Sequence, residues 1–229
     1  MRNSKFLRYN FLMWKEAEEF LEKDKYIGPL VKKYGSCKIK PRPKRYYFED
    51  LVDSIVQQQL SMKAATSIFN RIKEKVADKK DSKNPNKHKW RVGKTLEVEV
   101  SPEKILALSD KELRECGLSN AKVVYVKNLA EKVKRQEVKV ESLDKLPDEE
   151  VMKELVAVKG IGEWTAHMFL MFTLARPDIF PVGDLGLRNA FKKVIQKDLN
   201  PNEMSKFAER WKPWRTVASW YIWKTLENP

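Results

Sequence analysis

The chain contains little cysteine and little histidine. Its 229 residues include two cysteines, Cys37 and Cys116, and two histidines, His88 and His167. Two cysteines cannot form a disulfide framework or a four-cysteine cluster. Two histidines far apart in the sequence do not supply the ligand spacing of a zinc site. We therefore expect no metal site built from side chains.

Long apolar runs are also missing. No stretch reaches the roughly 20 apolar residues that cross a bilayer, and the N-terminus lacks the apolar centre of a signal peptide. Hydrophobic residues still make up 42% of the chain, which is enough for a packed core. We expect an intracellular protein, in the cytoplasm and nucleoid or in the nucleus, that has no membrane partner and is a monomer.

Negative charge is in deficit, because 32 Asp and Glu face 46 Lys and Arg and leave a net charge of +14. Residues 71–94 carry ten basic and three acidic residues, which is half of that excess. Such a charge favours a polyanionic partner, most often nucleic acid. The basic segment has two interpretations that stay open: a solvated polar loop, or an arm that contacts phosphates.

Helical patterns recur along the chain, whereas strand patterns are scarce. Ser109 and Glu112 form a capping box, and other helix-start signals stand at Ser101 and Asn200. Apolar residues follow helical spacing in the segments 48–60, 62–76, 119–134 and 148–158. Only residues 94–100 alternate like a strand, so one small β-hairpin near 90–100 is possible. The sequence predicts an all-α fold of about ten helices.

The stretch from Leu155 to Phe191 is the most informative part of the chain. Gly160 and Gly162 flank one apolar residue between two predicted helices. Glycine permits a positive φ, and the helix that follows exposes unpaired N–H groups that can bind an anion. An ordinary helix corner has the same spacing. Asp184 directly precedes another helical pattern, where an aspartate is commonly an N-cap.

A wider pattern is more specific. Gly-Ile-Gly-Glu-Trp-Thr-Ala at 160–166 precedes Phe-Pro-Val-Gly-Asp at 180–184, and Asp184 follows Trp164 by 20 residues. This arrangement resembles the helix-hairpin-helix (HhH-GPD) DNA glycosylase superfamily, and within it the AlkA-type DNA-3-methyladenine glycosylase II family. Three further stretches agree with the resemblance, and they lie at 54–61, 117–122 and 211–223.

The resemblance implies two helical lobes around a cleft. One lobe would be residues 46–175, with the helix-hairpin-helix motif at 155–172. The other would combine residues 1–45 with 176–229. Asp184 would then lie where the chain passes from one lobe to the other, which is a common place for a site.

The resemblance also implies roles for single residues. Asp184 would be the catalytic carboxylate, which stabilises positive charge on the sugar or orients water against it. The base pocket would contain Trp164, Met168 and Trp223, whose aromatic faces attract the positive charge of an alkylated base. Trp164 stands where strand-cutting relatives carry a Schiff-base lysine, so the covalent imine route would be closed. His167 would be a structural neighbour of this site.

Contacts to DNA follow from the same resemblance. A base in a duplex must be flipped out before an enzyme reaches it, and a wedge residue then fills the gap. Gln59, with Gln58 beside it, would provide the wedge. The hairpin would hold the DNA backbone through Lys159, Gly160, Gly162 and Thr165. No cofactor is expected, although backbone carbonyls of such a hairpin can bind a monovalent cation, Na⁺ or K⁺.

Together these features predict a monofunctional glycosylase of base excision repair. Its partner would be double-stranded DNA with damaged bases, and it would release 3-methyladenine and 7-methylguanine to leave an abasic site. Two alternatives remain: a glycosylase for another lesion, such as hypoxanthine or oxidised guanine, and a non-catalytic helix-hairpin-helix DNA-binding protein. The pairing of Asp184 with an apolar pocket helix counts against the second alternative.

Overall fold

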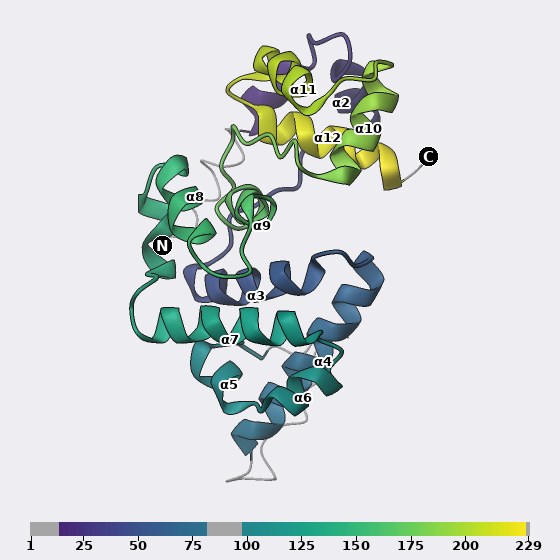
Figure 1. Ribbon diagram of the computed structural model, residues 1–229. Coiled ribbons are helices and arrows are strands. Elements are labelled where there is room, and N and C mark those ends of the chain that lie inside the picture. The colour runs from purple at the N-terminus through teal and green to yellow at the C-terminus, as the bar shows by residue number, and fades with distance from the viewer. Residues whose placement is uncertain (1–13, 82–97, 228–229) are drawn as a thin grey trace. The chain divides into compact units, whose positions relative to one another are not determined.

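The computed structural model describes residues 14–81 and 98–227 (Figure 1). These residues are helical and contain no strand, which confirms the predicted all-α class. The possible β-hairpin lies outside the described residues except for 98–100, which have no regular structure. Residues 82–94 of the basic segment 71–94 lie outside them as well. Within the two described ranges, no helix is both long enough and apolar enough to cross a membrane.

Backbone contacts divide the chain into two compact units. One unit is residues 42–169, and the other combines the chain before residue 42 with the chain from residue 170 onward. The sequence predicted the first of these units as residues 46–175, so its two boundaries lie four and six residues further along the chain than those of the structure. Each unit has its own hydrophobic core, and each is described separately below.

The unit of residues 42–169 is built around α3 and α7. The ribbon shows α7 running alongside α3, with α5 packed against its other side (Figure 1). Ile55 of α3 and Leu129 of α7 are completely buried in the core between these helices. The α-helices of this unit are α3 (Tyr47–Gln57), α4 (Met62–Asp81), α5 (Pro102–Ala107), α6 (Asp110–Glu115), α7 (Asn120–Lys134), α8 (Asp148–Val156) and α9 (Glu163–Met168). Two 3-10 turns, Lys44–Tyr46 and Val140–Lys145, complete it.

The second unit is held together by aromatic rings. Phe191 of α10 meets the rings of Phe180, Phe207 and Trp211 at edge-to-face angles. Such pairs stabilise a core beyond the area that they bury. Residues 14–21 are helical, and the named helices are α2 (Gly28–Tyr34), α10 (Leu185–Ile195), α11 (Pro201–Ala208), the 3-10 turn Glu209–Trp211, and α12 (Arg215–Glu227). Before α10, Asp178 forms a bidentate ion pair with Arg215 of α12.

Local signals in the sequence placed the helix starts correctly. The capping boxes of Ser109 with Glu112 and of Asn200 with Glu203 are both present. Ser101 caps α5, and its proline lies in the first turn. The helix after the hairpin changes type, because the α-helical pattern ends at Met168 and a π-helical turn follows at Phe169–Thr173. Such turns are frequent at functional sites.

The partly buried carboxylate of Asp53 on α3 makes the stability of the first unit, residues 42–169, depend on pH. Glu49 is 3% exposed, pairs with Lys73 and accepts a hydrogen bond from the Val100 N–H. One turn later, Asp53 accepts a hydrogen bond of 2.8 Å from the Gln57 amide. Burial raises the pKa of Asp53 from 3.8 to about 6, although the Gln57 hydrogen bond opposes the rise. Folding therefore favours the protonated form, and the stability that this form contributes is lost as pH rises through 6.

We predict that Asp53→Asn stabilises the protein at pH 8, because asparagine removes the buried charge and keeps an acceptor for Gln57. The gain should be about 1–2 kcal/mol above pH 7 and should vanish below pH 4, where the native aspartate is neutral. Urea unfolding at pH 4, 6 and 8 measures it. Asp50→Asn is the control, since Asp50 pairs with Arg42 and should give no gain. A difference that does not change with pH contradicts the assignment.

Candidate functional site

Asp184 is the N-cap of α10. Its Oδ1 atom accepts a hydrogen bond of 2.6 Å from the backbone N–H of Leu187, as its place in the sequence predicted. The same oxygen accepts a second hydrogen bond of 3.0 Å from the indole Nε1 of Trp223. Two donors from different helices hold the carboxylate in one orientation. An oriented carboxylate of this kind can face a substrate atom without first rearranging.

Gly186 allows this arrangement to be compact. A Cβ atom at residue 186 would lie 3.1 Å from Asp184 Oδ1 and 3.6 Å from Trp223 Nε1. Any larger residue would crowd the hydrogen bond between the two side chains. The absence of a side chain at Gly186 therefore leaves room for the hydrogen bond between Asp184 and Trp223. The sequence does not predict this role, because Asp184 and Trp223 are 39 residues apart.

Two exposed apolar side chains adjoin the Asp184–Trp223 pair, one by ring contact with Trp223 and one as the next residue after Asp184. Phe172 is 39% exposed, and its ring centroid lies 5.8 Å from that of Trp223. Leu185, next to Asp184 in the sequence, is 61% exposed. The sequence assigned Trp223 to the wall of a base pocket; the structure adds that its indole N–H holds Asp184. Phe172 was not singled out, because it looks like any other residue in an apolar helical run.

The helix-hairpin-helix motif forms between α8 and α9. Gly160 has a φ of 92°, a conformation that other residues rarely adopt, and a Cβ atom there would overlap the Tyr125 ring. Ile161 is buried, whereas Gly162 is exposed and is the N-cap residue of α9. Lys159 is exposed as well. This turn presents the Lys159 side chain and the Gly162 backbone to solvent, whereas Gly160 is half-buried against Tyr125.

The first turns of α9 contain the other predicted site residues. Trp164 and Met168 are one turn apart, and both are partly buried. Thr165 is 1% exposed, and its hydroxyl accepts a hydrogen bond of 3.0 Å from Gln58. The side chain of Thr165 thus faces the protein, and its predicted contact with a DNA backbone stays a prediction. Burial lowers the pKa of His167 below its usual 6.5 and favours the neutral imidazole.

Three consecutive glutamines end α3, and their side chains go in three directions. Gln57 donates to Asp53 on its own helix. Gln58 donates across to the hairpin, 2.9 Å to the carbonyl oxygen of Gly160 and 3.0 Å to Thr165. Gln59 is exposed and has a φ of 57°. Of the two predicted wedge residues, only Gln59 thus has a solvent-exposed side chain with no hydrogen bond among those described.

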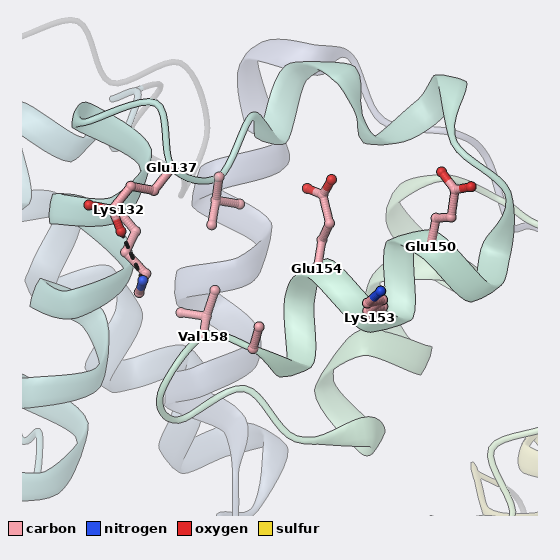
Figure 2. Close-up of a pocket in the computed structure, with 8 residues that line it drawn as sticks. Lys132, Glu137, Glu150, Lys153, Glu154 and Val158 are labelled. Atoms are coloured by element: carbon pink, nitrogen blue, oxygen red, sulfur yellow. Dashed lines mark hydrogen bonds and ion pairs between the residues drawn. The ribbon is translucent and has the colours of Figure 1, made fainter.

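A depression of about 520 Å³ also lies in the first unit, between the end of α7 and α8 (Figure 2). Figure 2 shows Glu150 and Glu154 on α8, and Lys132 paired with Glu137. The lining residues are Lys132, Glu137, Val138, Glu150, Lys153, Glu154, Ala157 and Val158. Three carboxylates against two ammonium groups do not give the positive charge that DNA phosphates require. We assign this depression no role in the function.

In the parts of the chain that the structure describes, no three His, Cys, Asp or Glu side chains are arranged so that they could hold a metal ion. The hairpin carbonyls remain the place for the predicted monovalent cation. One of them, the Gly160 oxygen, already accepts the Gln58 hydrogen bond, and another, that of Val158, accepts from the Ile161 N–H at 3.0 Å.

Comparison with known proteins agrees with this geometry. The chain is 31% identical over 215 residues to the alkylbase DNA glycosidase-like protein mag2 of Schizosaccharomyces pombe, covering 92% of this chain and 93% of that protein. It is 33% identical over 185 residues to DNA-3-methyladenine glycosylase 1 of the same yeast, covering 80% and 73%. The crystal structure of the S. pombe 3-methyladenine DNA glycosylase Mag1 with abasic DNA has a TM-score of 0.70 and 31% identity, covering 93% and 97%.

A family model covers most of the chain as well. It describes the HhH-GPD superfamily of base excision DNA repair proteins, and it matches residues 52–216. The matched region includes the three glutamines at 57–59, the hairpin and Asp184. Fold, motif and sequence identity therefore agree, and the chain belongs to the HhH-GPD superfamily of base excision DNA repair proteins.

Proposed function

We propose that this chain is a monofunctional DNA glycosylase that removes alkylated purines, 3-methyladenine and 7-methylguanine, from double-stranded DNA. The observation that carries the proposal is the oriented carboxylate of Asp184, held by the Leu187 N–H and the Trp223 indole beside exposed apolar side chains. The names of the similar proteins support the choice of substrate, since both S. pombe relatives are named for alkylated bases.

The reaction replaces one bond to the sugar with another. The bond between C1′ and the base nitrogen breaks, and the base leaves with the electron pair. Positive charge then develops on C1′ and the ring oxygen, and water adds its oxygen to C1′ and loses a proton. A carboxylate near C1′ stabilises this charge and can orient the water. We assign that role to Asp184.

An alkylated purine needs little chemical activation by the enzyme before it leaves the sugar. The base already carries positive charge and is therefore a good leaving group, so the pocket has to recognise more than it has to activate. Indole faces attract cations by about 0.5–2 kcal/mol. We assign recognition to Trp164, Met168 and Trp223, and we add Phe172, whose ring meets that of Trp223.

DNA contact is assigned to the two exposed turns of the first unit. Lys159, Gly160 and Gly162 of the hairpin would hold the phosphate backbone, since Lys159 and Gly162 are exposed and the open space beside Gly162 lets a strand approach closely, while Gly160 forms the turn between them. Gln59 would fill the gap left by the flipped base, because its side chain is exposed at the tip of a turn. A monovalent cation on the hairpin carbonyls would strengthen the phosphate contact.

We predict that Asp184→Asn abolishes base release and preserves the fold. Asparagine keeps an oxygen for the Leu187 and Trp223 hydrogen bonds, so unfolding should change by less than about 1 kcal/mol. Release of 3-methyladenine from methylated duplex DNA should fall at least about 100-fold, with duplex binding nearly unchanged. Asp198→Asn, which makes the same charge change just after α10, is the control. Retained release by Asp184→Asn would exclude the catalytic role.

A second prediction concerns the reaction type. Without an amine at residue 164, the wild type should leave intact strands that break only after alkali, and borohydride should trap no covalent complex. Trp164→Lys should not by itself create efficient strand cleavage, because an amine must also be desolvated and oriented to form a Schiff base. Gel analysis of an end-labelled duplex measures both. Strand breaks by the wild type before alkali would show a lyase and contradict the proposal.

A third prediction concerns Gln59. Gln59→Ala should weaken binding to a duplex with an abasic site about 10-fold, roughly 1.4 kcal/mol, and should change binding to undamaged duplex less than about twofold. Gln136→Ala is the matched control, because Gln136 is also exposed and has a φ of 59°. Equal losses on both duplexes would assign Gln59 to general binding instead.

A further inference from the structure

We propose that Lys122 and Gln58 are positioning residues that hold the wedge loop, residues 57–61, against the hairpin so that Gln59 enters the duplex in a fixed place. This inference rests on the proposed function of Gln59. Its basis is a set of hydrogen bonds within the first unit, and it separates the role of Gln58 from that of its neighbour.

Lys122 reaches the wedge loop from the first turn of α7. Its amine donates to the carbonyl oxygens of Val56 at 2.8 Å and Gln58 at 2.6 Å. These carbonyls belong to the end of α3, where no further helical turn supplies an N–H. Lysine near a helix C-terminus commonly binds such carbonyls. The Lys122 side chain is partly buried, and this burial lowers the pKa of its amine.

Gln58 makes the second connection, from the loop to the hairpin. Its backbone is extended at ψ 127°, which ends α3 and turns the side chain toward α9. The amide nitrogen donates to the Gly160 carbonyl and to the Thr165 hydroxyl, across more than 100 residues of sequence. Both acceptors lie within the hairpin motif. The loop and the hairpin are thus connected directly, and not only through the core.

The same face of α7 supports the hairpin. Tyr125 follows Lys122 by three residues and therefore lies on the same side of the helix. Its ring packs so closely against Gly160 that no side chain fits there. One helix thus sets the position of both turns: Lys122 holds the wedge loop and Tyr125 supports the hairpin. The spacing between wedge and phosphate contact follows from the geometry of α7.

Gln59 itself depends on these contacts. A φ of 57° is unfavourable for a residue with a Cβ atom, and such a backbone persists only where its surroundings impose it. The turn is closed by the Leu60 N–H, which donates to the Gln57 carbonyl at 3.1 Å. Lys122 and Gln58 hold the residues just before Gln59. Without them, Gln59 could relax to ordinary dihedrals and point elsewhere.

The functional reason is that a wedge must act at one distance from the phosphates. Groups that act together on a substrate need fixed relative positions, and small displacements are costly. A cap that served folding alone would affect every substrate equally. A cap that positions the wedge affects only DNA whose base must be flipped out. Single-stranded DNA, whose bases are not paired, distinguishes the two roles.

The test compares release of 3-methyladenine from a methylated duplex and from the same methylated strand alone. Lys122→Met and Thr165→Val, which removes one acceptor of Gln58 without changing shape, should each lower release from the duplex, Lys122→Met about 10-fold or more. Release from the single strand should change less than about twofold. Lys122→Arg should recover part of the loss. Lys127→Met, which removes another α7 lysine paired with Asp110, should affect neither substrate.

Combination with Gln59→Ala sharpens the result. If Lys122 acts through Gln59, the double variant should lose little more than Gln59→Ala alone, because coupled residues are not additive. Equal losses on duplex and single strand, or full additivity, would overturn the proposal and leave Lys122 as an ordinary helix cap. If Lys122→Met does not fold, release from duplex and from single strand by Thr165→Val tests the positioning role instead.

A second readout separates this inference from the proposed function. The fluorescence of 2-aminopurine placed beside an abasic site in a duplex reports unstacking at the wedge and needs no base release. Positioning variants should lose this signal as Gln59→Ala does. A wild type that gives the signal but releases no methylated base would refute the proposed function and keep the positioning role. Variants that keep the full signal would refute the positioning role.

Discussion

The backbone groups at helix ends are the constraint on which this structure depends. A fold made of short helices has many ends, and each end leaves N–H or C=O groups without helical partners. Most helices of the described chain are only 6–15 residues long. Side chains such as Ser101, Ser109 and Ser119 satisfy some of these groups. The residues that we assign to function satisfy others.

Asp184 shows how a cap and a site can share one side chain. Its Oδ1 atom satisfies the start of α10, and the same bond fixes the direction of the carboxylate. Trp223 adds a donor from α12, which packs against α10. A capping aspartate is common and needs no further explanation. A cap that also receives an indole N–H, from a tryptophan whose ring meets exposed Phe172, supports the substrate role that we propose for Asp184.

Local patterns made much of this structure predictable, and tertiary contacts set the limit. The capping boxes, the positive φ of Gly160 and the cap at Asp184 depend on residues close in sequence, so they could be read directly. The bond between Asp184 and Trp223 could not, nor could the pairing of Gln58 with Thr165. Thr165 was assigned to the DNA side because a hairpin sequence does not say which face of α9 is buried.

The three glutamines at the end of α3 also differ in ways that only tertiary contacts determine. Residue type cannot distinguish Gln57, Gln58 and Gln59, because all three have the same donors and acceptors. Their place relative to the end of α3 distinguishes them. The last helical residue turns back to its own helix, the residue that ends the helix reaches the hairpin, and the next one, at positive φ, faces outward. The position proposed for the wedge therefore follows from where α3 stops, at the carbonyls of Val56 and Gln58 that Lys122 binds.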